Sequence, residues 1–309
     1  MDNHVNCYFF VPGFSEKYRT GGLMVIKDVA GIVEKKSEYC SKFVTTHESC
    51  TDALSPEQAC REANSDSLFF VTWGPLVSAH IKLIRKNIPD ARIIYYAQSF
   101  GWNIKVPPRI PIICVSRFVM SQWALYAPEN YCAYIAPPLH SIFKMTNQTR
   151  DIDVLIHKRK QNSYCLNHLL PALQKENLNI EIIDEWISQE NFAALLNRTK
   201  VFLYATELHK AGLFRRLPGE GFGLPALEAL ACGAIVGSNL LGGVTDFLTP
   251  GENCIKLQNG DLHSDVTSIR DAAHAFAVNE KAAHEIAEEY SFNAASEKWT
   301  RALGTLSKM

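Results

Sequence analysis

Short runs of apolar, β-forming residues alternate with helix-like segments along almost the whole chain, and this alternation restricts its fold more than any other feature. The runs are continuously apolar rather than mixed with polar residues, which is typical of parallel strands buried on both faces. The pattern therefore predicts an α/β protein built from doubly wound parallel sheets. In the first half, the strand-like runs are Val5–Val11, Lys42–Thr46, Leu68–Trp73, Arg92–Ala97 and Pro111–Val115.

A proline-containing stretch at Ala136–Arg150 interrupts the alternation and predicts a linker. The alternation then resumes, with helix-like segments such as Tyr164–Lys175 and strand-like runs at Ile152–His157, Ile180–Asp184, Val201–Ala205 and Ala234–Gly237. The length of 309 residues suits about two domains. We therefore expect two Rossmann-like domains, residues 1–140 and 141–290, that face each other across a cleft and hold a ligand there.

Charge and cysteine content exclude several classes of protein. Lys and Arg number 31 against 32 Asp and Glu, so the net charge of -1 provides no field for nucleic acid, and we expect no nucleic-acid partner. Nine cysteines at scattered spacings contain no Cys-x-x-Cys pair, which indicates reduced thiols and no zinc site. The sequence contains neither a secretory signal nor an apolar run long enough to cross a bilayer. These features predict a cytoplasmic protein.

The stretch from Pro218 to Gly233 carries the most chemical information. Gly221 and Gly223 allow the backbone to approach a ligand closely just before a helix begins. Free N–H groups at this helix start carry partial positive charge and suit a phosphate. The groups concerned belong to Phe222, Gly223 and Leu224.

Two carboxylates flank this turn, Glu220 before it and Glu228 inside the helix. Acids beside an anion site make sense when the ligand also carries hydroxyl groups, because carboxylates accept hydrogen bonds from hydroxyls. A nucleotide sugar has both a diphosphate and sugar hydroxyls. The alternative is a tight βα turn followed by a solvated Glu228.

The same residues resemble a known family. Glu220 and Glu228, with Phe222-Gly223 between them, are similar to the signature of family 4-like glycosyltransferases of the GT-B fold, the group 1 glycosyltransferases. The resemblance continues at Gly242-Gly243 and over Pro250–Leu257. It is strong over Val201–Leu257 and weak over Met1–Ala97.

This resemblance implies a retaining glycosyltransferase that moves a sugar from a nucleotide-sugar donor to a glycan or other hydroxyl acceptor, without a metal or cofactor. It implies that Glu220 acts beside the donor sugar and that Glu228 binds the ribose. The backbone at Gly221–Leu224 would hold the diphosphate, with Gly243 near the nucleotide. The resemblance also implies that the last helix, residues 291–309, packs back on the N-terminal domain.

A basic run, His157-Lys158-Arg159-Lys160, follows the first strand of the second half. The family uses an Arg and a Lys in this region to stabilise the departing diphosphate. The resemblance therefore implies catalytic roles for Arg159 and Lys160 and donor binding for Lys158, and the sequence leaves open which of the three makes the contact. The alternative is a solvated basic turn.

The N-terminal half offers two further candidates. Gly22 lies in Thr20-Gly21-Gly22, where the family has a Gly-Gly pair against the phosphate or the acceptor, although a plain βα turn explains it equally. Gln98 occupies the place where the family often has a His that touches the donor sugar. An amide can bind hydroxyls but cannot carry a proton at neutral pH, so this departure puts sugar contacts from the first domain in doubt. We expect Gln98 on the acceptor side.

Three segments allow more than one interpretation. Asp151-Ile152-Asp153 spells a metal-binding triplet, but it lies at a strand start, away from the expected cleft, so no metal site is predicted. The loop Thr206–Leu217 either closes over a substrate or is a solvated insertion. The basic stretch His80–Lys86 is interpreted as a solvated helix face. The alternative is weak peripheral contact with the inner face of a membrane and a lipid-linked acceptor.

Two other functions remain open on the same fold: a non-catalytic subunit that binds a partner or glycan, and a nucleotide-sugar epimerase. A role in polysaccharide biosynthesis is an analogy only. The sequence does not identify the nucleotide base, the sugar, the acceptor, the linkage or the oligomeric state.

Overall fold

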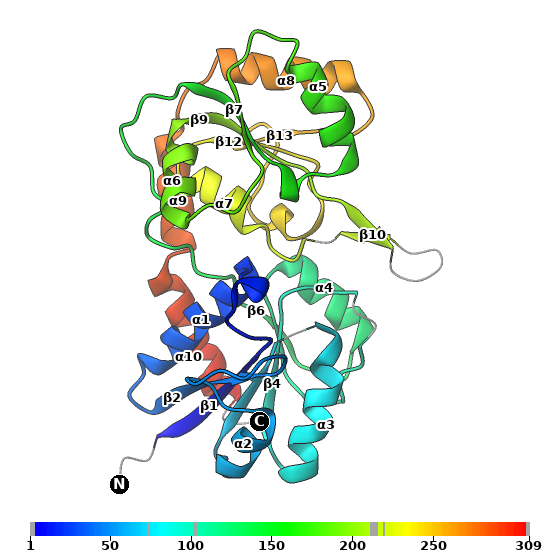
Figure 1. Cartoon of the computed structure of the whole chain (residues 1–309), viewed down its shortest axis with the longest axis vertical. Coiled ribbons are helices and arrows are strands. Elements are labelled where there is room, and N and C mark those ends of the chain that lie inside the picture. The colour runs from blue at the N-terminus through cyan, green and yellow to red at the C-terminus, as the bar shows by residue number, and fades with distance from the viewer. Residues whose placement is uncertain (1–3, 73, 102–103, 211–215, 219, 307–309) are drawn as a thin grey trace. The chain divides into compact units, whose positions relative to one another are not determined.

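The computed structural model describes residues 4–72, 74–101, 104–210, 216–218 and 220–306. The chain divides into two compact units (Figure 1). Unit 1 comprises Met1–Pro138 together with Phe292–Met309, and unit 2 comprises Leu139–Ser291.

The described residues of unit 1 form one parallel six-stranded sheet in the order β2-β1-β3-β4-β5-β6. Helices cover both faces, with α1 and α10 packed together on one and α2 and α3 on the other (Figure 1). The strands are β1 (Val5–Val11), β2 (Tyr39–Thr45), β3 (Leu68–Val71), β4 (Arg92–Ala97), β5 (Ile112–Cys114) and β6 (Cys132–Tyr134). The helices are α1 (Gly21–Glu34), α2 (Pro56–Glu62), α3 (Val77–Asn87), α4 (Arg117–Tyr126) and α10 (Phe292–Leu306), with 3-10 turns at Glu16–Tyr18 and Gly74–Leu76.

Polar caps explain where several helices of unit 1 begin. The hydroxyl of Thr20 accepts a hydrogen bond from the Leu23 N–H at the start of α1, and Ser116 does the same at the start of α4. Ser55 and Gln58 form a reciprocal capping box before α2. These side chains satisfy N–H groups that have no acceptor inside the helix.

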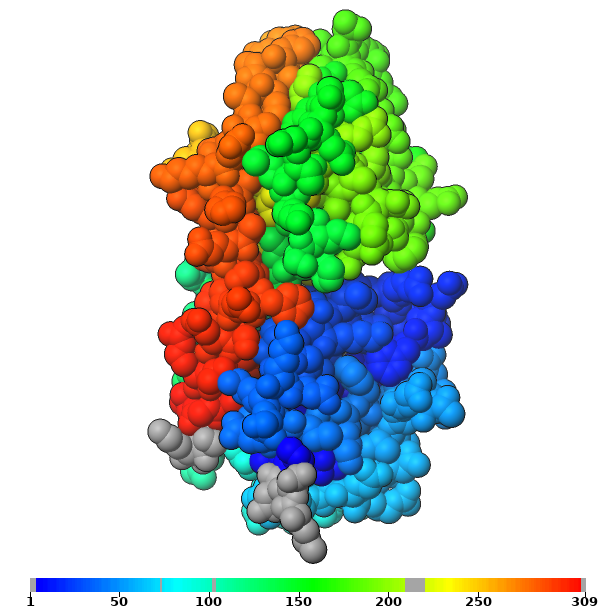
Figure 2. All heavy atoms as spheres, turned by 90° about the vertical axis from the view of Figure 1, so that its left-hand side faces the viewer, coloured from blue at the N-terminus to red at the C-terminus, as the bar shows by residue number. Residues whose placement is uncertain are grey.

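The last helix, α10, belongs to unit 1, although more than 150 residues separate it from the rest of that unit. Its Trp299 is fully buried, with ring centroids 6.0 Å from Phe70 and 5.5 Å from Tyr96. In Figure 2 the C-terminal helix, in red, lies against the blue N-terminal segments. The chain therefore closes the core of its first unit with its final helix.

The described residues of unit 2 form a parallel five-stranded sheet in the order β13-β12-β9-β7-β8. Helices α5 and α8 pack together on one face, and α6, α7 and α9 cover the other (Figure 1). The strands are β7 (Ile152–His157), β8 (Ile180–Ile183), β9 (Thr199–Tyr204), β12 (Ile235–Ser238) and β13 (Cys254–Lys256). The helices are α5 (Leu170–Leu173), α6 (Gln189–Arg198), α7 (Leu224–Ala231), α8 (Leu262–His274) and α9 (Glu280–Glu289), with 3-10 turns at Lys158–Lys160 and Gly242–Asp246.

The predicted α/β class with doubly wound parallel sheets is confirmed, and the structure adds local detail at three places. The helix predicted over Tyr164–Lys175 contains a π-helical turn, Cys165–Leu169, before the short α5. The edge strand β6 was not predicted. The loop Thr206–Leu217 contains an antiparallel hairpin of β10 (Leu208–Lys210) and β11 (Arg216–Pro218).

Among the described residues, no helix is both long enough and apolar enough to cross a membrane.

Candidate active site

The candidate site lies at the carboxyl ends of the central strands of unit 2. Along the order β8-β7-β9-β12, the chain reverses its winding between β7 and β9, which is the place where doubly wound sheets bind ligands. The basic run Lys158–Lys160 follows β7 directly. Tyr204 ends β9, and the loop with Gly242 and Gly243 follows β12. The residues predicted for the donor in the second half of the chain therefore meet at one edge of one sheet.

Side-chain amides hold the loops at this edge in place. Gln161 donates to the Leu203 carbonyl at 2.6 Å and accepts from the Ala205 N–H at 3.1 Å. Asn239 accepts from the Thr206 N–H at 3.2 Å and donates to the Thr206 carbonyl at 2.8 Å. The segments that follow β7, β9 and β12 are thus connected directly, so the groups they carry have fixed positions.

The glycine turn before α7 has the open backbone that the sequence predicts. Gly223 adopts φ +99°, a left-handed conformation that favours glycine, and no side chain caps the helix. In the described part of the chain, the N–H groups of Phe222, Gly223 and Leu224 donate to no acceptor. These N–H groups are available to an anion at the helix start.

Close backbone packing supports this turn from behind. A Cβ added at Gly243 would lie 2.1 Å from the Gly221 carbonyl oxygen and 2.6 Å from the Phe222 Cα. The Gly243 N–H donates to the Glu220 carbonyl at 3.3 Å. Only glycine at position 243 allows this approach, so the loop after β12 fixes the turn's shape.

Glu220 is partly exposed at the entrance to the turn, and Tyr204 anchors it. The Tyr204 hydroxyl donates a hydrogen bond to Glu220 Oε2. Burial and the negative charges of Glu220 and Glu228 raise the pKa of Tyr204 well above its ordinary value. The phenol therefore stays protonated and acts as the donor. Tyr204 is not predictable from the sequence, because a tyrosine at the end of an apolar strand looks like an ordinary core residue.

Glu228 is half-buried on α7. Burial raises its pKa to about 8, and the charge of nearby Lys160 acts in the opposite direction. The carboxyl group is therefore mostly neutral at pH 7 in the free protein. One of the predicted cations therefore acts electrostatically on the predicted ribose-binding acid.

The structure distinguishes the three cations of the basic run. Lys158 forms an ion pair with Asp184, which follows β8. Arg159 and Lys160 are exposed, and their charges act with burial to lower the pKa of His157. Arg159 and Lys160 are thus better placed than Lys158 to meet a ligand.

In unit 1, the structure brings Gly22 and Gln98 together. The Gln98 side chain donates from Nε2 to the Gly22 carbonyl at 2.8 Å, and a Cβ at residue 22 would lie 2.6 Å from Gln98 Oε1. Both residues follow the carboxyl ends of strands, β1 and β4 respectively. The Gln98 amide and the Gly22 carbonyl therefore lie together at the carboxyl edge of the unit 1 sheet.

The Asp-x-Asp triplet makes structural ion pairs. Asp151 pairs with Arg198, and Asp153 pairs with Lys200 at 2.6 Å. Over the residues that the structure describes, no group of three or more His, Cys, Asp or Glu side chains is arranged to hold a metal ion. Of the loop Thr206–Leu217, residues 211–215 lie outside the described residues.

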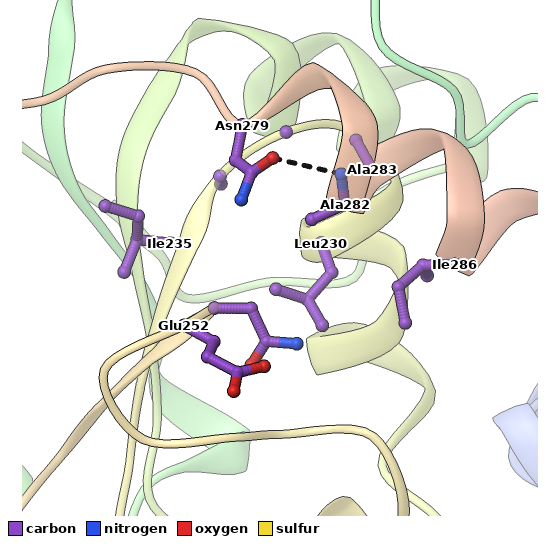
Figure 3. A pocket seen from close by; sticks show the side chains of 10 residues that line it. Leu230, Ile235, Glu252, Asn279, Ala282, Ala283 and Ile286 are labelled. Atoms are coloured by element: carbon purple, nitrogen blue, oxygen red, sulfur yellow. Dashed lines mark hydrogen bonds between the residues drawn. The ribbon is translucent and has the colours of Figure 1, made fainter.

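A small hollow elsewhere in unit 2 is separate from the turn. It lies between α7, α9 and β12, with apolar Leu230, Ile235 and Ile286 around it and Glu252 beside it (Figure 3). Asn279 accepts a hydrogen bond from the Ala282 N–H at its border. None of the predicted site residues lines this hollow.

Comparisons with known proteins agree with the fold and the motif. Residues 167–300 match the family model described as "Glycosyl transferase-like". No curated protein matches the chain in sequence.

Solved structures resemble the whole chain at low identity. A sucrose-phosphate synthase from Thermosynechococcus elongatus has 12% identity and a TM-score of 0.70, with 99% of this chain and 100% of that one covered. The HepE protein of Anabaena, in complex with UDP and glucose, has 10% identity and a TM-score of 0.70, covering 98% and 100%. A glycosyltransferase from Rickettsia africae has 11% identity and a TM-score of 0.69, covering 99% of each chain. The predicted GT-B fold and the resemblance to group 1 glycosyltransferases are confirmed.

Proposed function

We propose that this chain, which has the GT-B fold of group 1 glycosyltransferases, is a retaining glycosyltransferase that uses a nucleotide-sugar donor, a hydroxyl acceptor and no metal. One observation carries the proposal: the open N–H groups of Phe222–Leu224 lie between Glu220 and Glu228 in the chain, and the charge of Lys160 acts on Glu228. One turn thus combines N–H groups that can bind a phosphate with carboxylates that can bind sugar hydroxyls.

In this proposal, the N–H groups of the turn bind the diphosphate. Negative charge grows on the leaving diphosphate as the glycosidic bond breaks, and fixed positive groups stabilise it. Arg159 and Lys160 supply that charge, which is why no metal is required. Glu220 orients the donor sugar, and Glu228 accepts hydrogen bonds from the ribose. Unit 1, with Gln98, takes the acceptor.

A binding screen tests the donor assignment. UDP-, GDP-, ADP- and TDP-sugars are each added, and the ligand that binds the folded state raises the melting temperature. The UDP complex of HepE makes UDP-glucose the first compound to try. If none of these compounds stabilises the protein, the proposed function is wrong.

Glu228→Ala tests the ribose contact. We expect it to weaken binding of the nucleotide sugar by about 1–3 kcal/mol, through the loss of charge-assisted hydrogen bonds. Calorimetry measures the affinity, and Glu289→Ala, an exposed glutamate of α9, is the matched control. An affinity equal to that of the control would remove Glu228 from the site.

The double variant Arg159→Ala/Lys160→Ala tests the leaving-group clamp. Both side chains are exposed, so we expect the melting temperature to change little, while the turnover rate falls about 100-fold or more. Lys281→Ala, at an exposed position of α9, is the control. Full turnover in the double variant would contradict the clamp.

The same assays separate the two other functions. A non-catalytic subunit would bind the nucleotide sugar but neither transfer nor hydrolyse it. An epimerase would convert the nucleotide sugar with no acceptor present.

A further inference from the structure

We infer that Tyr204 is a positioning residue of this site, which holds Glu220 by one carboxylate oxygen so that the other faces the donor sugar. The inference rests on the proposed function and deepens it. The supporting observation is the hydrogen bond from the Tyr204 hydroxyl to Glu220 Oε2. In the described residues, Glu220 Oε1 accepts no hydrogen bond, so one oxygen is held and the other is available.

Tyr204 is itself held rigidly. It is fully buried at the end of β9, and its backbone is in register with Ser238 of the neighbouring β12. The next two residues along the chain are held by the side chains of Gln161 and Asn239. A hydrogen-bond donor fixed in this way gives the carboxylate that accepts from it a defined position. Without it, a partly exposed glutamate on a loop samples several rotamers.

The Tyr204 ring also lies beneath the glycine turn. Its Cε1 is 3.6 Å from the place where a Cβ of Gly223 would be. One buried tyrosine therefore lies next to the anion-binding turn and holds the acid that orients the sugar. This arrangement couples the position of the sugar to the position of the diphosphate.

A half-buried tyrosine in the same unit, which also donates to a carboxylate, provides a control. Tyr164 donates to Asp265 Oδ2 at 2.8 Å, and Asp265 also accepts from the Gln258 N–H at 2.7 Å. This pair has the same chemistry but holds the loop after β13. Tyr164→Phe thus removes a tyrosine–carboxylate hydrogen bond without touching Glu220.

The experiment compares Tyr204→Phe with Tyr164→Phe in the full chain. The probes are the nucleoside diphosphate glucose that most stabilises the wild type in a panel of UDP-, GDP-, ADP- and TDP-glucose, and the same diphosphate without the sugar. Calorimetry gives both affinities. We expect Tyr204→Phe to bind the bare diphosphate within about twofold of the wild type and the sugar conjugate about tenfold more weakly. Tyr164→Phe should keep both affinities.

A double-mutant cycle tests whether Tyr204 acts through Glu220. In the background Glu220→Ala, Tyr204→Phe should have no further effect on the affinity for the sugar conjugate. If Tyr204→Phe does not fold, 4-aminophenylalanine at position 204 keeps the ring with a weaker donor, and the sugar conjugate should again lose affinity selectively.

Three results would overturn the inference: unchanged affinity for the conjugate, an equal loss for both probes, or an additional loss in the Glu220→Ala background. A wild type that binds neither these four conjugates nor any other nucleotide sugar of the screen would instead refute the proposed function, and this inference with it.

Discussion

Under the proposed function, the charge of Glu228 would depend on whether the donor is bound. In the free protein, burial raises its pKa to about 8, so most molecules carry it protonated at pH 7. Ribose hydroxyls would favour the ionised form, because a carboxylate accepts two hydrogen bonds strongly. Binding of the donor should therefore release a proton from this residue.

The same pKa makes the stability of the free protein depend on pH. The folded state holds the Glu228 proton up to about pH 8, whereas an unperturbed glutamate loses it near 4.5. The free energy of unfolding should therefore fall as the pH rises from about 4.5 to about 8. Glu228→Gln cannot ionise, so its melting temperature should match the wild type near pH 5 and exceed it near pH 8.5.

Thermal melts monitored by circular dichroism at several pH values check this prediction. The exposed variant Glu289→Gln should follow the wild type throughout. A constant difference between Glu228→Gln and the wild type across this range would show that Glu228 does not change its charge there.

The residue types of the site could be predicted from the sequence, but their states and partners could not. The spacing of Glu220, Glu228 and the glycines is local, so it is visible in the chain. The hydrogen bond from Tyr204 and the ion pair of Lys158 with Asp184 join residues 16 and 26 positions apart. Such pairs depend on how the strands are ordered in the sheet. The burial of Glu228, which raises its pKa, depends on the packing of the whole unit.

At the scale of elements, the loop after β12 supports the turn before α7 by close backbone packing. Gly243→Ala would place a Cβ 2.1 Å from the Gly221 carbonyl oxygen, and the obstacle is backbone, which cannot rotate away. The turn must then shift, and its N–H groups lose their common direction. We expect the affinity for the nucleotide sugar to fall about tenfold or more.

Calorimetry with the donor from the binding screen measures this loss. Gly260→Ala is the matched control, because a Cβ at residue 260 would meet no atom within 4 Å. Equal affinities for the two variants would mean that the turn tolerates displacement and that its N–H groups do not bind the diphosphate.

Apolar periodicity predicted where most elements begin and end, and its failures have physical causes. The run Val5–Val11 is a strand over the residues expected. The segment Tyr164–Lys175 has the apolar spacing of a helix, but periodicity does not distinguish the i+5 hydrogen bonds of the π-turn Cys165–Leu169 from those of an α-helix. The edge strand β6 has only three residues, too few for any pattern.

At the scale of the whole molecule, segments that pack together can be far apart in the sequence. Only the family resemblance implied that the last helix returns to the first domain. In the structure, Trp299 of α10 packs on Phe70 and Tyr96, residues of strands near the start of the chain. The core of the first unit is therefore complete only with the last helix in place.

This packing predicts that the stability of unit 1 depends on Trp299. Trp299→Ala should lower the free energy of unfolding by about 3–5 kcal/mol, because it removes a fully buried indole and leaves a cavity beside Phe70 and Tyr96. Trp299→Phe should cost less, since it keeps part of the ring and removes an indole N–H that is buried without an acceptor in the described structure. Urea denaturation measures both values, and Leu125→Ala, at a side chain 80% exposed, should change stability by less than about 0.5 kcal/mol. If Trp299→Ala were as stable as Leu125→Ala, the core of unit 1 would be complete without α10.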